Sequence, residues 1–153
     1  MNKKPCFKDT LKLHATSNMA MLAVNAQSLQ QIEIISALSL ELETAIIVQF
    51  SAKYIPYFDN LIGVSRILNR YQKNKYLYFH LDHCTDKNTI NSCMNWGFDS
   101  VMIDGSAFPI SDNIIMTKDI VSLAHKLNVL VEGEVGVVGG VEDDFGDGGS
   151  TTF

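Results

Sequence analysis

The stretch Tyr76–Cys84, YLYFHLDHC, decides the fold, because it joins a buried strand to a run of reactive side chains. Apolar and aromatic residues predominate over 76–81, as in a strand covered on both faces. Successive side chains of a strand alternate between faces, so His80 and Asp82 share one face. His83 is expected to begin the following loop and to turn toward the same space. A histidine beside a carboxylate suits a zinc site with a neighbouring proton carrier, but also an ordinary hydrogen-bonded strand end.

Strand and helix patterns alternate on both sides of this stretch. The expected strands cover residues 21–24, 45–50, 76–81, 100–103 and 129–135, and the expected helices cover 28–43, 57–74, 85–97 and 111–127. The connections are too long for hairpins, which predicts a parallel sheet with right-handed crossovers. Ser28 and Gln31 form a capping-box pattern at the first helix. Gly97 is expected to end the third helix, and Ser111 or Asp112 to cap the fourth.

Polar side chains stand at the C-terminal end of every expected strand. They are Asn25, Gln49 with Ser51, Asp82 with His83, Asp104, and Glu134. Pattern alone allows a (β/α)8 barrel or an open doubly wound sheet. Polar groups that converge from five consecutive strands favour the barrel, because an open sheet concentrates its site at one switch point. A whole barrel takes roughly 250 residues. The predicted fold of these 153 residues is therefore α/β, an incomplete TIM barrel of about the first five βα units.

Length and composition limit the classes of function. A chain of 153 residues with 46% hydrophobic residues can bury the core of one domain. The net charge of −5 and the lack of a basic cluster argue against nucleic-acid binding. No apolar stretch approaches the roughly 20 residues of a membrane helix. The absence of a secretory signal pattern and the three cysteines, which fit reduced thiols, predict a cytoplasmic location.

Two further segments carry carboxylates. Glu132 and Glu134 share a strand face. Inside a barrel the pair would need a cation or hydrogen bonds, whereas on an edge strand it would face solvent. Asp104 opens an Asp-Gly-Ser sequence that is also common in ordinary turns. The glycine-rich stretch 138–144 is either a mobile lid or a solvated connection.

Taken together, these segments resemble the class II, zinc-dependent ketose-bisphosphate aldolases, which include the fructose- and tagatose-1,6-bisphosphate aldolases. The matching stretches are residues 20–25, 47–51, 79–83, 97–106 and 131–144, in family order. The His-x-Asp-His and Glu-x-Glu-x-Gly blocks are the two signature regions of the family. The resemblance implies that residues 1–144 form the N-terminal part of such a barrel and that 145–153 are a divergent, glycine-rich tail.

The resemblance implies roles for four strand-end residues. Asp82 is similar to the acid–base residue that protonates and deprotonates the C4 oxygen of the substrate. His83 is similar to the first zinc ligand. Asp104 and Glu134 are similar to carboxylates that help to bind the metal at an alternative or second position. Zinc in this family polarises the ketone and stabilises the enediolate that develops.

The resemblance also implies substrate-side roles for Asn25 and Ser51. The implied reaction is zinc-dependent cleavage of fructose or tagatose 1,6-bisphosphate to dihydroxyacetone phosphate and glyceraldehyde 3-phosphate. The implied partner is therefore a phosphorylated ketose, with no nucleic acid and no membrane. Because the family is commonly dimeric or tetrameric, a full-length protein is expected to form homo-oligomers.

The chain also departs from the family. Two further zinc histidines and the phosphate-binding glycine loop would lie beyond residue 153. Ala107 replaces a common histidine, and Cys84 stands where glycine or histidine is usual. One hypothesis is an N-terminal aldolase part with negligible activity alone, and the alternative is a truncated, catalytically inactive chain. A third is a small metal-binding module that uses His80, His83, Cys84 and Glu134.

Overall fold

The computed structural model describes residues 4–136, which form one layer of parallel strands with covering helices. The strands are β1 (Leu22–Asn25), β2 (Ile46–Ser51), β3 (Leu77–Cys84), β4 (Ser100–Ile103) and β5 (Leu130–Gly133). The helices are α1 (Phe7–Thr16), α2 (Leu29–Glu41), α3 (Asn60–Tyr71), α4 (Lys87–Trp96) and α5 (Ile110–Ala124), with 3-10 turns η1 (Ala52–Phe58) and η2 (His125–Leu127).

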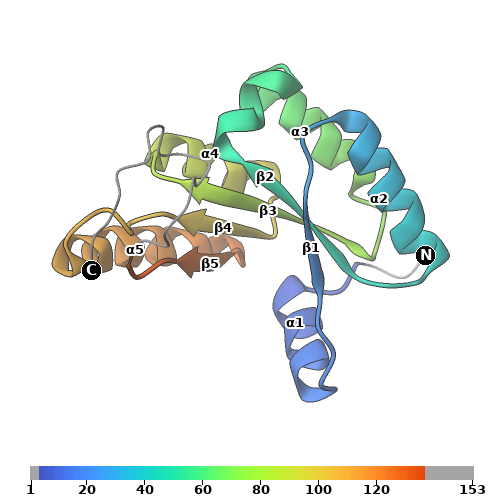
Figure 1. Ribbon diagram of the computed structural model, residues 1–153, viewed down its shortest axis with the longest axis horizontal. Coiled ribbons are helices and arrows are strands. Elements are labelled where there is room, and N and C mark those ends of the chain that lie inside the picture. Colours follow the sequence, from blue (N-terminus) through green and yellow to red (C-terminus); the bar gives the residue numbers. More distant parts are fainter. Residues whose placement is uncertain (1–3, 137–153) are drawn as a thin grey trace, which may run out of the picture.

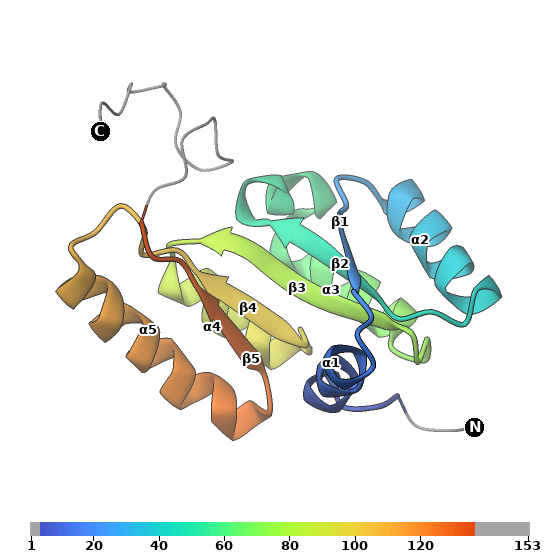
Figure 2. The same ribbon diagram turned by 60° about the horizontal axis from the view of Figure 1, so that its bottom comes forward.

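The sheet has the order β1-β2-β3-β4-β5, and all four pairings are parallel. Helices α2 to α5 lie along one face, whereas α1 lies near the end at which the strands begin (Figures 1 and 2). We call the face turned away from α2–α5 the inner face. This arrangement of consecutive βα units confirms the predicted α/β, partial-barrel fold. No helix among residues 4–136 is long and apolar enough to cross a membrane.

The main core lies between the sheet and helices α2 to α5. Alternate strand residues such as Val48, Phe50 and Leu81 are completely buried there, against helix residues that include Ile32 and Val64. Full burial of one such side chain stabilises the fold by about 1.5–3 kcal/mol. Apolar side chains of the strands thus point to the outer face, which is the face covered by α2–α5. The alternate side chains point to the inner face, where polar groups can lie.

Helix α1 closes the inner face at the strand-start end. The ring of Phe7 stacks on Tyr78 with 4.8 Å between centroids. The hydroxyl groups of Thr10 and Tyr78 lie 2.7 Å apart. The sequence patterns did not predict this helix, because its stability comes from contacts with β3 and not from a strong periodic stripe.

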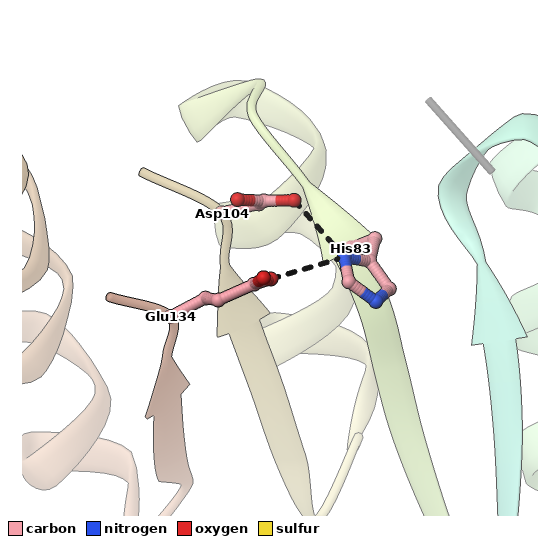
Figure 3. A group of neighbouring side chains, drawn as sticks. All are labelled: His83, Asp104 and Glu134. Atoms are coloured by element: carbon pink, nitrogen blue, oxygen red, sulfur yellow. Dashed lines mark hydrogen bonds and ion pairs between the residues drawn. The ribbon is translucent and has the colours of Figure 1, made fainter. Parts of the chain in front are cut away.

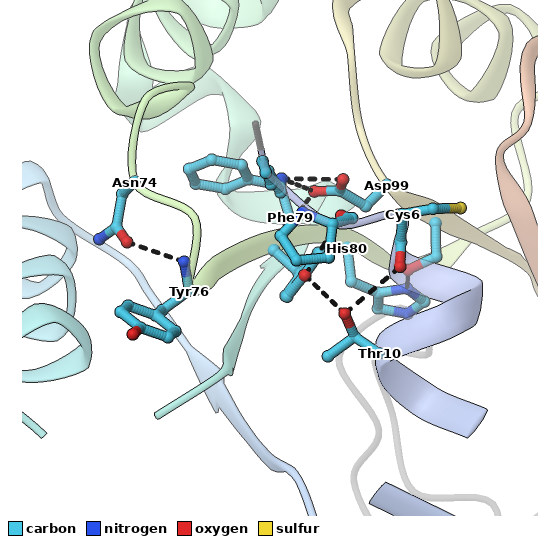
Figure 4. Close-up of polar contacts among 11 residues, drawn as sticks. Cys6, Thr10, Asn74, Tyr76, Phe79, His80 and Asp99 are labelled. Atoms are coloured by element: carbon cyan, nitrogen blue, oxygen red, sulfur yellow. Dashed lines mark hydrogen bonds and ion pairs between the residues drawn. The ribbon is translucent and has the colours of Figure 1, made fainter. Parts of the chain in front are cut away.

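An acidic residue ties the N-terminus to the start of the sheet. Asp99 accepts a 2.8 Å hydrogen bond from the main-chain nitrogen of Phe79 (Figure 4) and a 2.7 Å charged hydrogen bond from Lys4. Burial raises the pKa of Asp99, and the Lys4 ammonium group opposes that shift. The pair holds the segment before α1 against the loop that leads into β4.

Two of the predicted helix ends are confirmed. Ser28 caps α2, and its hydroxyl accepts a 3.3 Å hydrogen bond from the main-chain nitrogen of Gln31. The Gln31 side chain accepts from the nitrogen of Gln27, one residue before the cap. Gly97 ends α4 with φ +97°, a conformation that glycine adopts without steric cost.

The predicted cap of the helix 111–127 is wrong. Helix α5 begins at Ile110, so Ser111 and Asp112 already lie in its first turn. Pro109 precedes the helix with φ −52° and no side-chain cap. Because proline fixes φ near the helical value, the chain enters the helix earlier than the polar residues suggest. The last three predicted residues form η2.

The predicted helix 57–74 begins later and ends earlier than expected. Residues 52–58 form η1, which contains Pro56, and α3 follows Asp59, whose φ is +60°. The two turns pack closely, because a Cβ atom on Gly63 would lie 1.5 Å from the carbonyl oxygen of Phe58. Residues 1–3 and 137–153 lie outside the described part of the chain. The predicted domain boundary at residue 144, the tail 145–153 and the stretch 138–144 are therefore not described.

Candidate metal centre

The C-terminal strand ends bring most of the predicted site residues together on the inner face. His83, Asp104 and Glu134 each offer one ligand atom, and these atoms lie within 4.8 Å of one another. Figure 3 shows the three side chains pointing toward one point from β3 and from the ends of β4 and β5. His83 Nδ1 lies 2.9 Å from Asp104 Oδ2 and 3.7 Å from Glu134 Oε2.

A break in β3 turns His83 to this point. The residue belongs to the strand and does not begin the loop, which corrects the sequence-based expectation. Its φ is +41°, and the pairing with β4 shifts register between Leu81 and Cys84. Both of those neighbours are buried in the outer-face core. Regular alternation would place His83 on the outer face, so the bulge is what puts it beside Asp82 on the inner face.

Asp104 is a buried, ionised ligand candidate. Its side chain is 1% exposed. Oδ1 accepts hydrogen bonds from the Ser106 main-chain nitrogen at 3.0 Å and from the Ser106 hydroxyl at 2.6 Å. Burial raises the pKa of Asp104, but the hydrogen bonds from His83 and Ser106 outweigh it, so the net pKa lies below the ordinary value. The predicted Asp-Gly-Ser turn thus leaves Oδ2 facing the histidine.

The main chain of Glu134 is held by helix α5. The amide nitrogen of Asn113 donates a 2.6 Å hydrogen bond to the carbonyl oxygen of Glu134. Asn113 is itself wedged against the Asp104 turn, since a Cβ atom on Gly105 would lie 2.5 Å from Asn113 Oδ1. One buried amide therefore joins the two segments that carry the carboxylates. The sequence analysis missed Asn113, whose signal is a polar residue on the packed side of a helix.

Asp82, the predicted acid–base residue, lies next to this cluster and is 8% exposed. Its Oδ1 accepts a 3.2 Å hydrogen bond from Gln49 of β2. Ser51, at the end of the same strand, pairs with Asp82 in register and is 2% exposed. The Ser51 hydroxyl has no hydrogen-bond partner among residues 4–136. Asn25 ends β1 in register with Gln49 and is exposed.

His80 lies below Asp82 on the same strand face, as predicted. Its Nδ1 lies 2.8 Å from the Ser100 hydroxyl, and its Nε2 lies 3.6 Å from Glu132 Oε2. Burial, with a smaller contribution from His83, lowers the pKa of His80 to about 4. Glu132 and Glu134 thus share the inner face, with Glu132 the more exposed of the two.

The structure contradicts the third hypothesis, a small metal-binding module in which Cys84 is a ligand. Cys84 is 2% exposed, lies in the outer-face core and directs its thiol toward the carbonyl oxygen of Asp86 at 3.6 Å. The cluster of three potential ligands is completed by Asp104 and not by Cys84 or His80.

The donor set fits a divalent metal ion. One imidazole nitrogen and two carboxylates are ligands that zinc accepts, and three protein ligands leave an open coordination position. A bound cation would also stabilise the two carboxylates beside this histidine, because its charge offsets the free-energy cost of burying theirs. His83, Asp104 and Glu134 are therefore the residues that could hold a metal in the described part of the chain.

The profile of one protein family matches most of the sequence. The family is described as "Fructose-bisphosphate aldolase class-II", and the match covers residues 7–152. A 6-phospho-5-dehydro-2-deoxy-D-gluconate aldolase from Halalkalibacterium halodurans is 34% identical over 140 residues, or 89% of this chain and 49% of that protein. A fructose-bisphosphate aldolase from Giardia intestinalis is 32% identical over 124 residues, or 80% of this chain and 38% of that protein.

A solved structure supports the fold. The fructose-bisphosphate aldolase of Campylobacter jejuni superposes with a TM-score of 0.75 at 17% identity, over 84% of this chain and 45% of that one. The chain thus spans half or less of the length of these relatives. With a matching profile over nearly its whole length, the chain belongs to the class II fructose-bisphosphate aldolase family.

Proposed function

We propose that this chain carries the acid–base residue and part of the metal site of a metal-dependent aldolase that cleaves a phosphorylated keto sugar. The observation that carries the proposal is the convergence of His83, Asp104 and Glu134 within 4.8 Å, directly beside Asp82. Aldol cleavage needs a group that takes a hydroxyl proton and an electrophile that stabilises the negative charge left on the ketone side. Both requirements can be met at this strand end.

In this proposal each residue has one task. Asp82 takes the proton from the hydroxyl group next to the bond that breaks, and returns a proton in the condensation direction. His83, Asp104 and Glu134 hold the metal, with zinc as the proposed ion. A bound zinc ion would supply a Lewis acid for the substrate ketone.

Asn25 and Ser51 are proposed to bind the substrate. The Ser51 hydroxyl is a donor and acceptor at the rim, in register with Asp82. Asn25 is a solvent-exposed amide at the end of β1. In this proposal both bind hydroxyl groups of a sugar that approaches the inner face from the strand ends. A homo-oligomer at full length and a cytoplasmic location stay predictions.

The first proposed substrate is fructose or tagatose 1,6-bisphosphate, which yields dihydroxyacetone phosphate and glyceraldehyde 3-phosphate. A second candidate, 6-phospho-5-dehydro-2-deoxy-D-gluconate, is favoured by the name of the Halalkalibacterium relative. That compound has its ketone at C5 beside a phosphorylated C6, so aldol cleavage between C3 and C4 would also release dihydroxyacetone phosphate. The two candidates therefore share the ketone half of the reaction and differ in the aldehyde half.

The test is release of dihydroxyacetone phosphate from each of the three sugars, measured through NADH oxidation by glycerol-3-phosphate dehydrogenase. The protein is assayed at the length at which its source produces it, established by intact mass. We expect turnover that needs zinc, that a chelator abolishes, and that Asp82→Asn lowers by about 100- to 10,000-fold. The preferred sugar is the one with the highest kcat/KM.

The alternative is a catalytically inactive chain that keeps the family fold. Stoichiometric zinc binding without release of dihydroxyacetone phosphate from any of the three sugars would favour it. Absence of both zinc binding and turnover would contradict the proposed metal site itself.

A further inference from the structure

Below the metal centre, the inner face holds a buried histidine that the proposed function does not use. His80 is 4% exposed and Ser100 is 5% exposed. The two residues are partners in the β3–β4 register, and His80 Nδ1 lies 2.8 Å from Ser100 Oγ. The pair lines a pocket of about 330 Å³ on the inner face, together with Gln49 and Glu132. It thus forms a polar link between two neighbouring strands on the inner face.

The second ring nitrogen of His80 faces two carboxylates. Nε2 lies 3.6 Å from Glu132 Oε2 and 3.8 Å from Asp82 Oδ1, beyond hydrogen-bond distance. This buried nitrogen has no hydrogen-bond partner within the described part of the chain. A buried polar nitrogen left in that state destabilises the fold. A small rotation of either carboxylate would satisfy it, provided that the nitrogen carries a proton.

The position of the ring proton follows from these neighbours. Burial lowers the pKa of His80 to about 4, so the ring is neutral at pH 7 and carries one proton. With the proton on Nδ1, the lone pair of Nε2 would face two carboxylate oxygens, which repel it. With the proton on Nε2, the Ser100 hydroxyl donates to Nδ1 and the Nε2–H group faces the carboxylates. The second tautomer satisfies Nδ1 and places the Nε2–H group where a small rotation of either carboxylate would satisfy it.

We propose that Ser100 and His80 form a positioning pair for Asp82. The two carboxylates favour the Nε2–H tautomer, the Ser100 hydroxyl fixes the ring by donating to Nδ1, and the Nε2–H group attracts Asp82 Oδ1 from below. Gln49 contacts the same oxygen from β2 at 3.2 Å. Two donors from two strands then restrict rotation of the carboxylate that moves the proton. The catalytic part of this inference rests on the proposed function, whereas the tautomer does not.

The tautomer is tested by NMR on the full chain labelled with 15N-histidine, with and without zinc. The sequence has four histidines, and loss of one ring signal in His80→Gln assigns His80. We expect the Nε2–H form in the wild type and a larger share of the Nδ1–H form in Asp82→Asn/Glu132→Gln, where no charge repels the Nε2 lone pair. Ser100→Thr keeps the hydroxyl group and should keep the tautomer. The matched control is Ser122→Ala, an exposed serine on α5 that should change nothing.

The positioning role is tested by two amides that mimic different ring nitrogens. The amide nitrogen of His80→Gln reaches the position of Nε2, whereas that of His80→Asn reaches only the position of Nδ1. We expect His80→Asn to lower kcat by about 10- to 100-fold with KM nearly unchanged, and His80→Gln to recover most of that loss. Thermal unfolding of both variants controls for general destabilisation.

The outcomes separate the inference from the proposed function. An Nδ1–H tautomer in the wild type, an unchanged tautomer in Asp82→Asn/Glu132→Gln, or equal loss of kcat in both amide variants would overturn the positioning pair. A wild-type protein in the Nε2–H form that binds zinc but cleaves none of the sugars would overturn the proposed function. The tautomer would then stand without a catalytic role.

Discussion

The side-chain amide of Asn113 donates a 2.6 Å hydrogen bond to the main-chain oxygen of Glu134. This contact ties the first turns of α5 to the residue that follows β5. The Asn113 side of the contact is buried, because the residue is 5% exposed. The main chain of Glu134, a proposed metal ligand that follows an edge strand of the described sheet, is thus held from the outer side of the sheet by a residue on α5.

Replacing Asn113 with alanine should weaken both the fold and the metal site. The change leaves a buried carbonyl oxygen without its donor, which costs about 1–3 kcal/mol of unfolding free energy. Zinc affinity should fall by about 10- to 100-fold, because Glu134 loses its anchor. Urea unfolding and zinc titration calorimetry measure the two effects. Asn95→Ala, at an exposed position on α4, is the matched control. Unchanged zinc affinity in Asn113→Ala would contradict the anchoring role.

Replacing His83 with alanine should abolish zinc binding without unfolding the chain. His83 supplies the nitrogen ligand of the candidate cluster, and the two remaining carboxylates are not a sufficient zinc site. In the wild type, zinc at 100 times its Kd should stabilise the fold by about 2.7 kcal/mol, which appears as a rise in Tm. The rise should vanish in His83→Ala and persist in His125→Ala, at an exposed position in η2. An equal rise in both variants would place the metal elsewhere.

Acid should destabilise the fold partly through His80. Burial lowers its pKa from 6.5 to about 4 in the folded state, so the unfolded chain takes up this proton first as the pH falls. The stability due to His80 is therefore complete above about pH 6.5 and is lost as the pH falls toward 4, by about 3 kcal/mol in total. Urea unfolding between pH 4 and pH 7 should show a flatter profile for His80→Gln than for the wild type. Parallel profiles would mean that His80 is not buried as a neutral ring.

Truncating Phe7 should detach α1 from the sheet. The ring is 6% exposed and stacks on Tyr78, so Phe7→Ala removes a buried aromatic contact worth about 3–5 kcal/mol. Hydrogen exchange should then become fast in residues 7–16 before it changes in β3. Leu13→Ala, at a 60% exposed position on the same helix, should have little effect. Slow exchange in α1 of Phe7→Ala would show that other contacts hold it.

The sheet could be predicted from the sequence because each strand is an apolar run that ends in polar residues. That pattern located Asp82, Asp104 and Glu134 at one rim, where the structure has them. It could not predict α1, whose Phe7 finds its partner only after β3 has formed. The roles of the site residues stay predictions, which the zinc-binding and turnover measurements test.

The turn of His83 toward the inner face was predicted, but its place inside β3 and its backbone conformation were not. Nothing in local sequence preference requires a histidine at φ +41°, because the left-handed region is unfavourable for residues with a side chain. Likewise, Ser100 and Asn113 look like ordinary polar residues in a strand and a helix. Their importance comes from what they contact across the sheet, at His80 and Glu134.

The bulge in β3 limits how far the proposed proton carrier and the proposed metal ligand can move apart. Asp82 and His83 are consecutive residues whose side chains leave the same face of the strand, and their Cα atoms are about 3.8 Å apart through one peptide unit. Bond lengths, and not the packing of separate segments, therefore limit the distance between the proposed proton carrier and the proposed metal ligand. Small movements of the strands relative to one another would therefore move Asp82 and His83 together. Thermal motion would change the position of a substrate relative to these two residues more than it would change the distance between them.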